Sequence, residues 1–201
     1  FSLSAQMINN GMANLFTETP FFNEKYVRSV NLKSITGTIS TKKELGAIKS
    51  SEKKEAYIFN KKGNLIIHYL ANNTKGKKDT VFTFYEYNKE NKNAVMRVSD
   101  SYGFYSYTKN YDSSSRLLNQ VFSREKNASK SKMNFKLGEK YVIFEESYQY
   151  STQDTVQIVT TLNSNGRPYK VEKKFYNHLG YLTKSTTKLL ISNKTKYELY
   201  H

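Results

Sequence analysis

The sequence predicts a mainly β fold: a single antiparallel up-and-down meander, either a twisted open sheet or a half-barrel, with a short N-terminal helix. Two observations predict it. Aromatic residues make up 14% of the chain, with 17 Tyr and 12 Phe, and large rings favour the pleated surface of strands. A turn motif also recurs, in which an aromatic residue, Asn, two spacers, Gly, one residue and an apolar residue occupy Phe59–Leu65 and again Tyr176–Leu182.

Tyr111–Leu117 and Leu162–Pro168 are looser copies of this motif. Hairpin turns need positive φ, which Gly and Asn tolerate best, so we expect it at Gly63, Gly166 and Gly180 or at the adjacent Asn. The connections are short, and short connections make strands that are neighbours in sequence pair in space.

At 201 residues the chain suits one domain, which we place at residues 6–201. Residues 1–5 resemble the end of a signal peptide, because apolar and small residues finish at Ala5 and the polar Gln6 follows. An ordinary polar terminus is the alternative. The signal-peptide interpretation predicts export to the periplasm, the cell surface or the extracellular space. No apolar stretch is long enough to predict a transmembrane segment.

The N-terminal third carries the least regular pattern. Ile8, Met12, Leu15 and Phe16 lie on one helical face, and Pro20 would end that helix. Alternation over Tyr26–Leu32 and then over Ile35–Ile39 predicts two strands. Thr41–Glu44 fits either a capping box or a solvated loop, and Gly46 favours the loop.

From residue 56 onward the pattern is strand, turn, strand. Arg124–Lys140 is the longest stretch without periodicity, and we expect an extended loop or a ragged hairpin there. The predicted strands are 56–59, 65–70, 80–87, 94–98, 103–111, 116–122, 141–150, 155–162, 169–176, 181–190 and 196–200.

The middle strands are apolar on both faces. Phe82 and Phe84 alternate with Tyr85 and Tyr87, so the sheet needs a cover on each side. We expect the N-terminal helix or the basic stretch to cover these strands. The later strands are apolar on one face only, since Tyr169, Val171 and Phe175 alternate with charged residues.

The formal net charge of +15 has two interpretations. It fits an anionic partner, or it is a by-product of composition, because Lys outnumbers Arg 27 to 5 and phosphate sites favour Arg forks. Basic clusters fall in separate places along the chain, so we expect no specific nucleic-acid role.

The sequence carries no recognisable catalytic motif. The chain has three His and no Cys, which excludes disulfides and thiol chemistry, and neither a zinc-type His pair nor a nucleophile motif occurs. We therefore expect a protein that is not an enzyme and has no cofactor and no metal site. One surface stands out as a low-specificity ligand surface, against the alternative of cross-strand packing and solvated turns: Tyr105, Tyr107, Tyr111, Lys75, Lys77 and Lys78.

The repeated hairpin motif resembles the YD-repeat (Rhs-type) pattern of bacterial secreted and surface proteins, over roughly residues 56–200. Tyr111-Asp112 carries the Tyr-Asp pair itself, with Ser115 in place of Gly. The resemblance implies a β-meander and an exported bacterial setting, and it implies no catalytic residue. A helix followed by one antiparallel sheet is also similar in architecture to periplasmic lipoprotein carriers, which cradle acyl chains.

These observations predict a non-catalytic exported β-meander that binds a protein or an anionic envelope polymer. The alternative is a periplasmic carrier that holds a lipid or another apolar ligand in a concave sheet. An enzyme whose site has no sequence signature is a third hypothesis.

Overall fold

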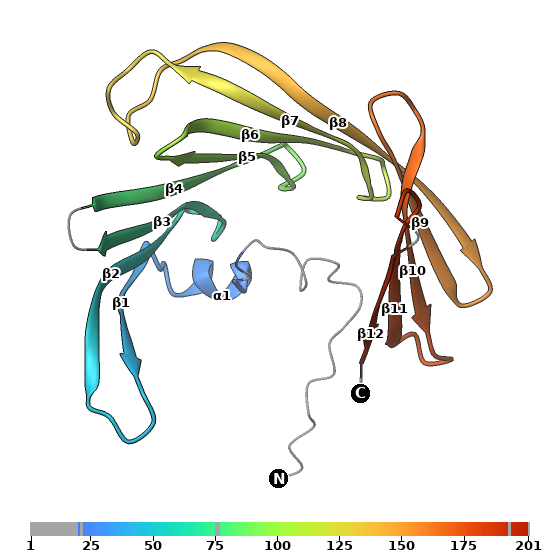
Figure 1. Ribbon diagram of the computed structural model, residues 1–201, viewed down its shortest axis with the longest axis horizontal. Helices are drawn as coiled ribbons and strands as arrows, with labels where there is room; N and C mark the ends of the chain where they lie inside the picture. Colours follow the sequence, from blue (N-terminus) through green and yellow to red (C-terminus); the bar gives the residue numbers. More distant parts are fainter. Residues whose placement is uncertain (1–19, 21, 75–76, 193, 201) are drawn as a thin grey trace. The chain divides into compact units, whose positions relative to one another are not determined.

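The computed structural model describes residues 20, 22–74, 77–192 and 194–200. It confirms the predicted fold class: one antiparallel sheet whose strands are hydrogen-bonded in sequence order from β1 to β12, after one short helix (Figure 1). The elements are α1 (Glu24–Ser29), β1 (Ser34–Lys42), β2 (Ile48–Phe59), β3 (Leu65–Thr74), β4 (Lys77–Tyr87), β5 (Asn93–Asp100), β6 (Gly103–Tyr111), β7 (Leu117–Asn127), β8 (Leu137–Gln153), β9 (Val156–Leu162), β10 (Pro168–Tyr176), β11 (Leu182–Leu189) and β12 (Thr195–Leu199).

Five hairpin turns share one hydrogen-bonding scheme. The first residue is Asn or Asp, and its side-chain oxygen accepts from the backbone N–H four residues on, while its own N–H donates to that residue's carbonyl. The fourth residue has positive φ, as predicted for three of these turns. The first residues are Asn60, Asn88, Asp112, Asn163 and Asn177, and the fourth are Gly63, Asn91, Ser115, Gly166 and Gly180.

Helix α1 corrects the prediction of a strand over Tyr26–Leu32. The Asn23 side chain caps the helix by accepting from the Tyr26 N–H at 3.1 Å, and Asn31 follows it with a φ of 51°. A helix of six residues buries only Val27, so no period of 3.6 residues shows in the sequence. The helix predicted over residues 8–16 and the predicted signal-peptide end at residues 1–5 lie outside the described residues.

The chain forms two compact units. The α1 unit holds Phe22–Asn110 and Gln120–Ile143, and the C-terminal unit includes Tyr111–Asn119 and Phe144–His201.

One face of the α1 unit's sheet lies under the loop between β7 and β8. Phe135 of this loop packs edge-on against Phe84, with ring centroids 4.9 Å apart, and lies 5.3 Å from the ring of Phe104. We call this the loop-covered face. Two cross-strand rows run over it: Ala56–Tyr69–Phe82–Ser99–Phe104 and Ile58–Ile67–Phe84–Arg97–Ser106.

The opposite face of the same strands lies under α1. Val27 packs with Phe59, Leu65 and Tyr85 in the buried core, and Phe22 closes over the Tyr57 and Phe59 rings. We call this the helix-covered face. Its rows are Tyr57–His68–Thr83–Val98–Tyr105 and Tyr85–Met96–Tyr107. Both faces are therefore covered, as the two-sided apolar pattern requires.

The basic stretch 124–140 is a hairpin rather than one extended loop. Strand β7 continues to Asn127, β8 begins at Leu137, and the Ala128 N–H donates to the Lys136 carbonyl at 2.7 Å. The loop is held from within by Asn127, whose side chain accepts from the Ser129 and Lys136 N–H groups. Lys132 ties it to β4 by donating to the Thr80 carbonyl at 3.1 Å.

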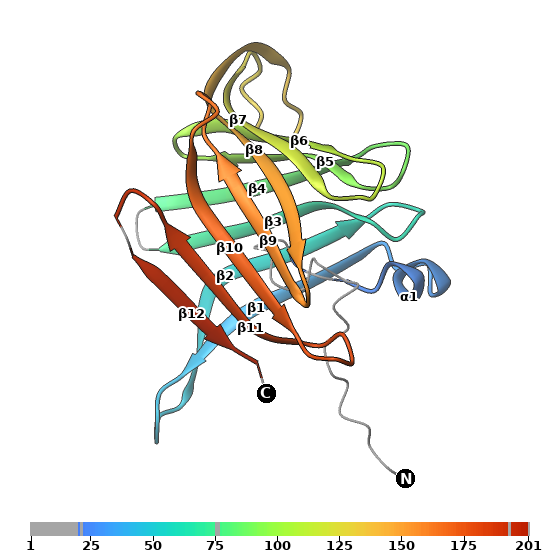
Figure 2. The ribbon, with the colours of Figure 1, turned by 90° about the vertical axis from the view of Figure 1, so that its right-hand side faces the viewer.

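The C-terminal unit contains strands β9–β12, which lie side by side (Figure 2). Its described residues include few buried side chains, and the most buried are Thr161 and Ser185. Polar contacts take the place of an apolar core. The Glu146 carboxylate accepts from the hydroxyls of Tyr148 and Tyr169, and the Arg116 guanidinium lies 5.0 Å from the centroid of the Tyr150 ring.

Candidate functional site

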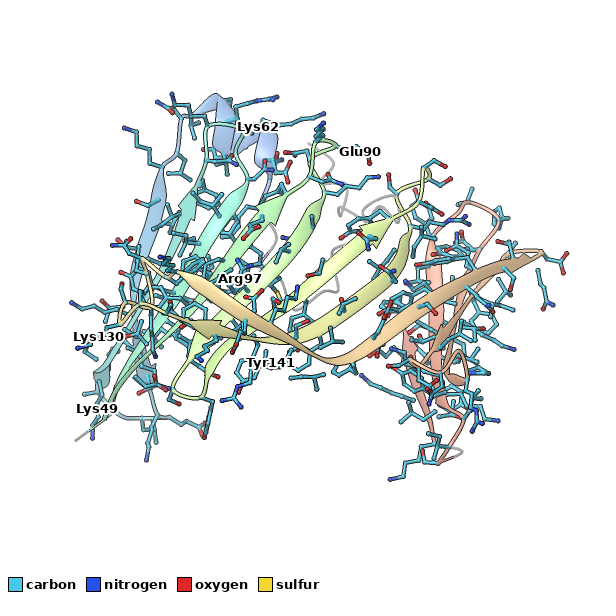
Figure 3. All side chains as sticks on the ribbon, turned by 90° about the horizontal axis from the view of Figure 1, so that it is seen from above. Lys49, Lys62, Glu90, Arg97, Lys130 and Tyr141 are labelled. Carbon is cyan, nitrogen blue, oxygen red and sulfur yellow. The ribbon has the colours of Figure 1, made fainter. Side chains whose placement is uncertain are left out.

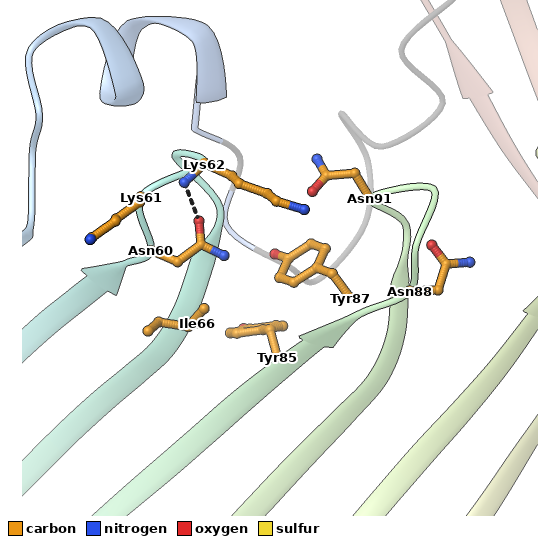
Figure 4. Close-up of a pocket in the computed structure, with 8 residues that line it drawn as sticks. All are labelled: Asn60, Lys61, Lys62, Ile66, Tyr85, Tyr87, Asn88 and Asn91. Carbon is orange, nitrogen blue, oxygen red and sulfur yellow. Dashed lines mark hydrogen bonds between the residues drawn. The ribbon is translucent and has the colours of Figure 1, made fainter.

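A cavity of about 430 Å³ lies at the turn end of the α1 unit, and we call it the turn-end cavity (Figure 4). The turns β2–β3 and β4–β5 supply its polar wall, and β3 and β4 supply its apolar wall. Its lining residues are Asn60, Lys61, Lys62, Ile66, Tyr85, Tyr87, Asn88 and Asn91.

The two turns are held together beside α1. The Asn64 amide, which is fully buried, donates to the Asn91 side-chain oxygen at 2.6 Å, and the Asn91 amide donates to Glu24 of α1 at 3.2 Å. Gly63 lets the α1 backbone approach closely, since a Cβ there would lie 3.0 Å from the Glu24 carbonyl carbon. The helix therefore positions one side of the cavity.

Two tyrosines form the floor of the turn-end cavity. Tyr85 is buried, and burial raises the pKa of its hydroxyl to about 12. Tyr87 donates its hydroxyl to the Leu65 carbonyl at 2.8 Å, and burial raises its pKa as well. Both phenols stay neutral at physiological pH, so the rings offer flat apolar surface with no negative charge.

Lys61 and Lys62 supply the charge. Both side chains are exposed, and within the described part of the chain neither forms an ion pair. The Lys62 side chain extends across the mouth towards Tyr87 and Asn91 (Figure 4). The Lys61 side chain extends away from the two tyrosines (Figure 4). One free ammonium group beside amides and rings, with a second on the same turn, suits an anionic ligand that also carries hydroxyl groups.

A second cluster lies on the helix-covered face, where Glu55, Tyr57 and His68 meet. Glu55 accepts from the Tyr57 hydroxyl at 2.5 Å and lies 2.8 Å from His68 Nε2, and the Tyr57 and His68 rings stack with centroids 4.6 Å apart. The Tyr57 hydroxyl lowers the pKa of Glu55, and burial together with Glu55 raises the pKa of Tyr57 to about 12. A phenol held neutral is a poor nucleophile, so this cluster fits a structural role.

An ion network is buried on the loop-covered face. The Arg97 guanidinium contacts Glu125 and Glu86, each at 2.5 Å, and lies 5.3 Å from the centroid of Phe135 (Figure 3 labels Arg97). Burial alone would lower the pKa of Arg97, but the hydrogen bonds to both carboxylates outweigh burial and raise it. Arg97 and Glu125 are buried while Glu86 is exposed, so the network links the core to the surface.

The tyrosines predicted as a ligand surface lie in two units. Tyr105 and Tyr107 are half-buried on the helix-covered face, with ring centroids 5.8 and 4.7 Å from that of Phe122. The contacts of Tyr105 and Tyr107 with Phe122 are cross-strand packing, the alternative to a ligand surface. Tyr111 belongs to the C-terminal unit, where burial raises its pKa. Lys75 and the side chains of Lys77 and Lys78 lie outside the described residues.

The sequence did hold a signal for the turn-end cavity. Asn60 and Asn88 begin equivalent turns 28 residues apart, a spacing that places both at one edge of the sheet. The motif alone predicts only turns, because it has no chemistry of its own and no sequence pattern predicts α1.

In the ranges that the structure describes, no three His, Asp or Glu side chains gather as metal ligands would. None of the helices there has the length and apolar character needed to cross a membrane.

A comparison with known families finds no family model that matches the chain, and a comparison with curated proteins likewise finds no match. The YD-repeat resemblance stays a prediction.

Proposed function

We propose that the protein is an exported, non-catalytic binding protein that recognises an anionic envelope polymer at the turn-end cavity. The observation that carries this proposal is the placement of the unpaired Lys62 ammonium group across the cavity mouth, above the floor formed by Tyr85, Tyr87 and Ile66, with the exposed Lys61 on the same turn. Aromatic rings stack on the apolar face of a sugar, and amides bind its hydroxyls.

The polymer should be acidic. Lys side chains bind carboxylates as point charges, and the net charge of +15 would steer a polyanion towards the protein. Three Asn residues line the cavity, but their side-chain oxygens already accept hydrogen bonds, so what they offer a sugar hydroxyl is mainly the amide N–H groups of Asn60 and Asn88.

The test is binding of a polyuronate, alginate, measured by calorimetry at physiological salt with neutral dextran as the reference polymer. The Lys61→Gln/Lys62→Gln double variant should lose at least five-fold in affinity. Lys42→Gln/Lys49→Gln removes the same charge beside the β1–β2 turn, at the end of β2 far from the cavity, and should lose less than two-fold; Figure 3 labels Lys49. Equal losses in the two variants would mean that only net charge matters and would refute the site.

A second function, carriage of an apolar ligand, is favoured by the helix-covered face. Val98, Met96 and Tyr105 there are only partly buried, so this face keeps accessible apolar and aromatic surface. Mass spectrometry of solvent extracts from purified protein distinguishes the two functions. A stoichiometric lipid would favour the carrier, and its absence together with alginate binding would favour the polymer.

A further inference from the structure

Strand β8 is much longer than β9, so part of β8 has a partner strand on one side only. In the sheet β8 lies between β7 and β9, and β9 pairs with β8 only from Ser147 to Gln153. The first residues of β8, Leu137–Ile143, belong to the α1 unit, and no described strand pairs with them on the side away from β7. We call this side of Leu137–Ile143 the open edge.

The contacts at the two ends of this stretch show which backbone groups face the open edge. The Lys136 carbonyl accepts from the N–H of Ala128, which follows β7. The Glu145 N–H donates to the hydroxyl of Ser164, which follows β9 on the other side of β8. Residues two apart in a strand present their N–H and C=O groups to the same side, so even-numbered residues face β7 and odd-numbered residues face the open edge. The N–H groups on the open edge are those of Glu139, Tyr141 and Ile143.

The side chains at the end of the open edge are apolar and exposed on both faces of the sheet. Tyr141, Val142 and Ile143 are 56%, 63% and 52% exposed. Successive side chains of a strand point to opposite faces, so neither face is covered here (Figure 3 labels Tyr141 on β8). Aromatic and β-branched residues beside unpaired N–H and C=O groups form a template for one more strand.

The two end strands of the sheet lack this combination. Strand β1 carries five Ser or Thr side chains and has Gly37 near its centre, and β12 has five residues, of which Lys196 and Glu198 are charged. Polar, short or charged edges resist the addition of a strand. Among the described edges, the open edge of β8 is therefore the most favourable for pairing with another polypeptide.

The hairpin that leads into the open edge is strongly basic. Residues 124–140 contain six cationic and two acidic side chains. Both acidic groups are engaged, since Glu125 pairs with the buried Arg97 and Glu139 accepts from the Tyr141 hydroxyl at 2.6 Å. The charge that remains available beside the open edge is therefore positive.

The lysines of this hairpin favour an acidic partner. Lys130, Lys136 and Lys140 are exposed, and none of them forms an ion pair within the described ranges. Lys140 donates only to a neutral group, the Thr108 hydroxyl, at 3.1 Å. Complementary charge attracts a partner, whereas a second copy of this chain would bring the same excess of positive charge to the contact. The charges therefore favour an acidic segment of a different protein over self-association.

We propose that the open edge docks an extended, acidic segment of another protein, which joins the sheet as an added strand beside β8. The backbone of the segment exchanges hydrogen bonds with the odd-numbered residues of the open edge. Its apolar side chains pack against Tyr141 and Val142, and its carboxylates pair with Lys136 and Lys140. The site uses none of the residues that line the turn-end cavity, so it stands whether or not a polymer binds there.

The experiment is titration of the full chain with the peptide acetyl-DEVTVTVED-amide, which has alternating apolar residues between acidic ends. This peptide should bind, and acetyl-KKVTVTVKK-amide, with the same centre and basic ends, should bind at least ten-fold more weakly. Hydrogen exchange followed by NMR should slow at least ten-fold at the N–H groups of Glu139, Tyr141 and Ile143. The N–H groups of Lys140 and Val142 already face β7, so their exchange should change less than two-fold.

Two substitutions of one residue separate strand addition from contact with the aromatic ring. Tyr141→Pro removes both the ring and the N–H group that faces the open edge, and an edge position tolerates Pro. Tyr141→Ala removes the ring and keeps the N–H group. Tyr141→Pro should therefore bind the acidic peptide at least five-fold more weakly than Tyr141→Ala does.

Two double variants test the role of charge. Lys136→Gln/Lys140→Gln should weaken binding of the acidic peptide at least five-fold. Lys61→Gln/Lys62→Gln removes the same charge at the turn-end cavity and should keep the peptide affinity within two-fold.

The proposal is overturned if the acidic peptide does not bind, if the two peptides bind equally well, or if the two double variants lose affinity alike. Equal slowing of exchange at odd-numbered and even-numbered residues would also overturn it. So would a dimer of the protein alone, detected by sedimentation and lost in Tyr141→Pro, because the open edge would then belong to a second copy. The exchange measurement uses the unaltered chain, so it tests the site even if Tyr141→Pro fails to fold.

Discussion

Gly63→Ala should destabilise the protein far more than Gly180→Ala, although both glycines occupy the same position of the same turn. Their φ values are 87° and 79°, so the left-handed strain of about 1 kcal/mol is common to both. A Cβ at Gly180 meets nothing within 4 Å. A Cβ at Gly63 clashes with the Glu24 carbonyl oxygen and lies 3.2 Å from the Arg28 nitrogen, and both atoms are α1 backbone.

A backbone clash cannot be relieved by a side-chain rotation, so α1 must move away from the β2–β3 turn. The movement exposes Val27, whose burial is worth about 1.5–3 kcal/mol. Gly63→Ala should therefore cost about 2–3 kcal/mol more than Gly180→Ala.

The assay is urea unfolding followed by circular dichroism and tyrosine fluorescence, because the chain has no Trp. If α1 is displaced, Val27→Ala should add little in the Gly63→Ala background while remaining costly alone. Equal costs for the two glycine variants, within about 0.5 kcal/mol, or full additivity with Val27→Ala, would refute the close packing of α1 on the turn.

Three further outcomes are expected. Ser115→Gly should stabilise the protein by about 1 kcal/mol in urea unfolding, because Ser115 holds a φ of 68° and its side chain is exposed. Glu125→Gln should cost about 3 kcal/mol by leaving Arg97 buried beside a neutral partner, whereas the same change at the exposed Glu86 should cost about 1 kcal/mol or less. Burial raises the pKa of Tyr85 from 10 to about 12, so between those values the unfolded chain ionises while the folded chain keeps the proton, and stability falls as pH rises. Alkaline unfolding of Tyr85→Phe should show a smaller loss above pH 10, and an unchanged pH dependence would contradict this assignment.

The turns were predictable because their chemistry is local. Asn60 or Asn163 bonds to N–H groups two and four residues away, and a Gly three residues on accepts positive φ, so five residues suffice to specify the hairpin. The Asn88 turn shows the limit, since Asn91 replaces Gly there with a φ of 63°.

Helix α1 was not predictable from periodicity. Tyr26 and Val30 fit a strand's alternation, yet both are exposed, and the buried Val27 between them has its partners on β2, β3 and β4. The distant partner Gly63, rather than the helix sequence, decides where α1 sits.

By itself, the sequence determines the antiparallel meander, the positions of its turns and the need to cover the middle strands on both faces, because alternation and turn chemistry act over a few residues. Only the tertiary structure decides what provides the cover and which polar groups meet. Phe135 reaches Phe84 and Phe104, and Arg97 finds Glu125, across 28 to 51 residues of chain. Those contacts depend on register and loop path, and no local pattern encodes either one.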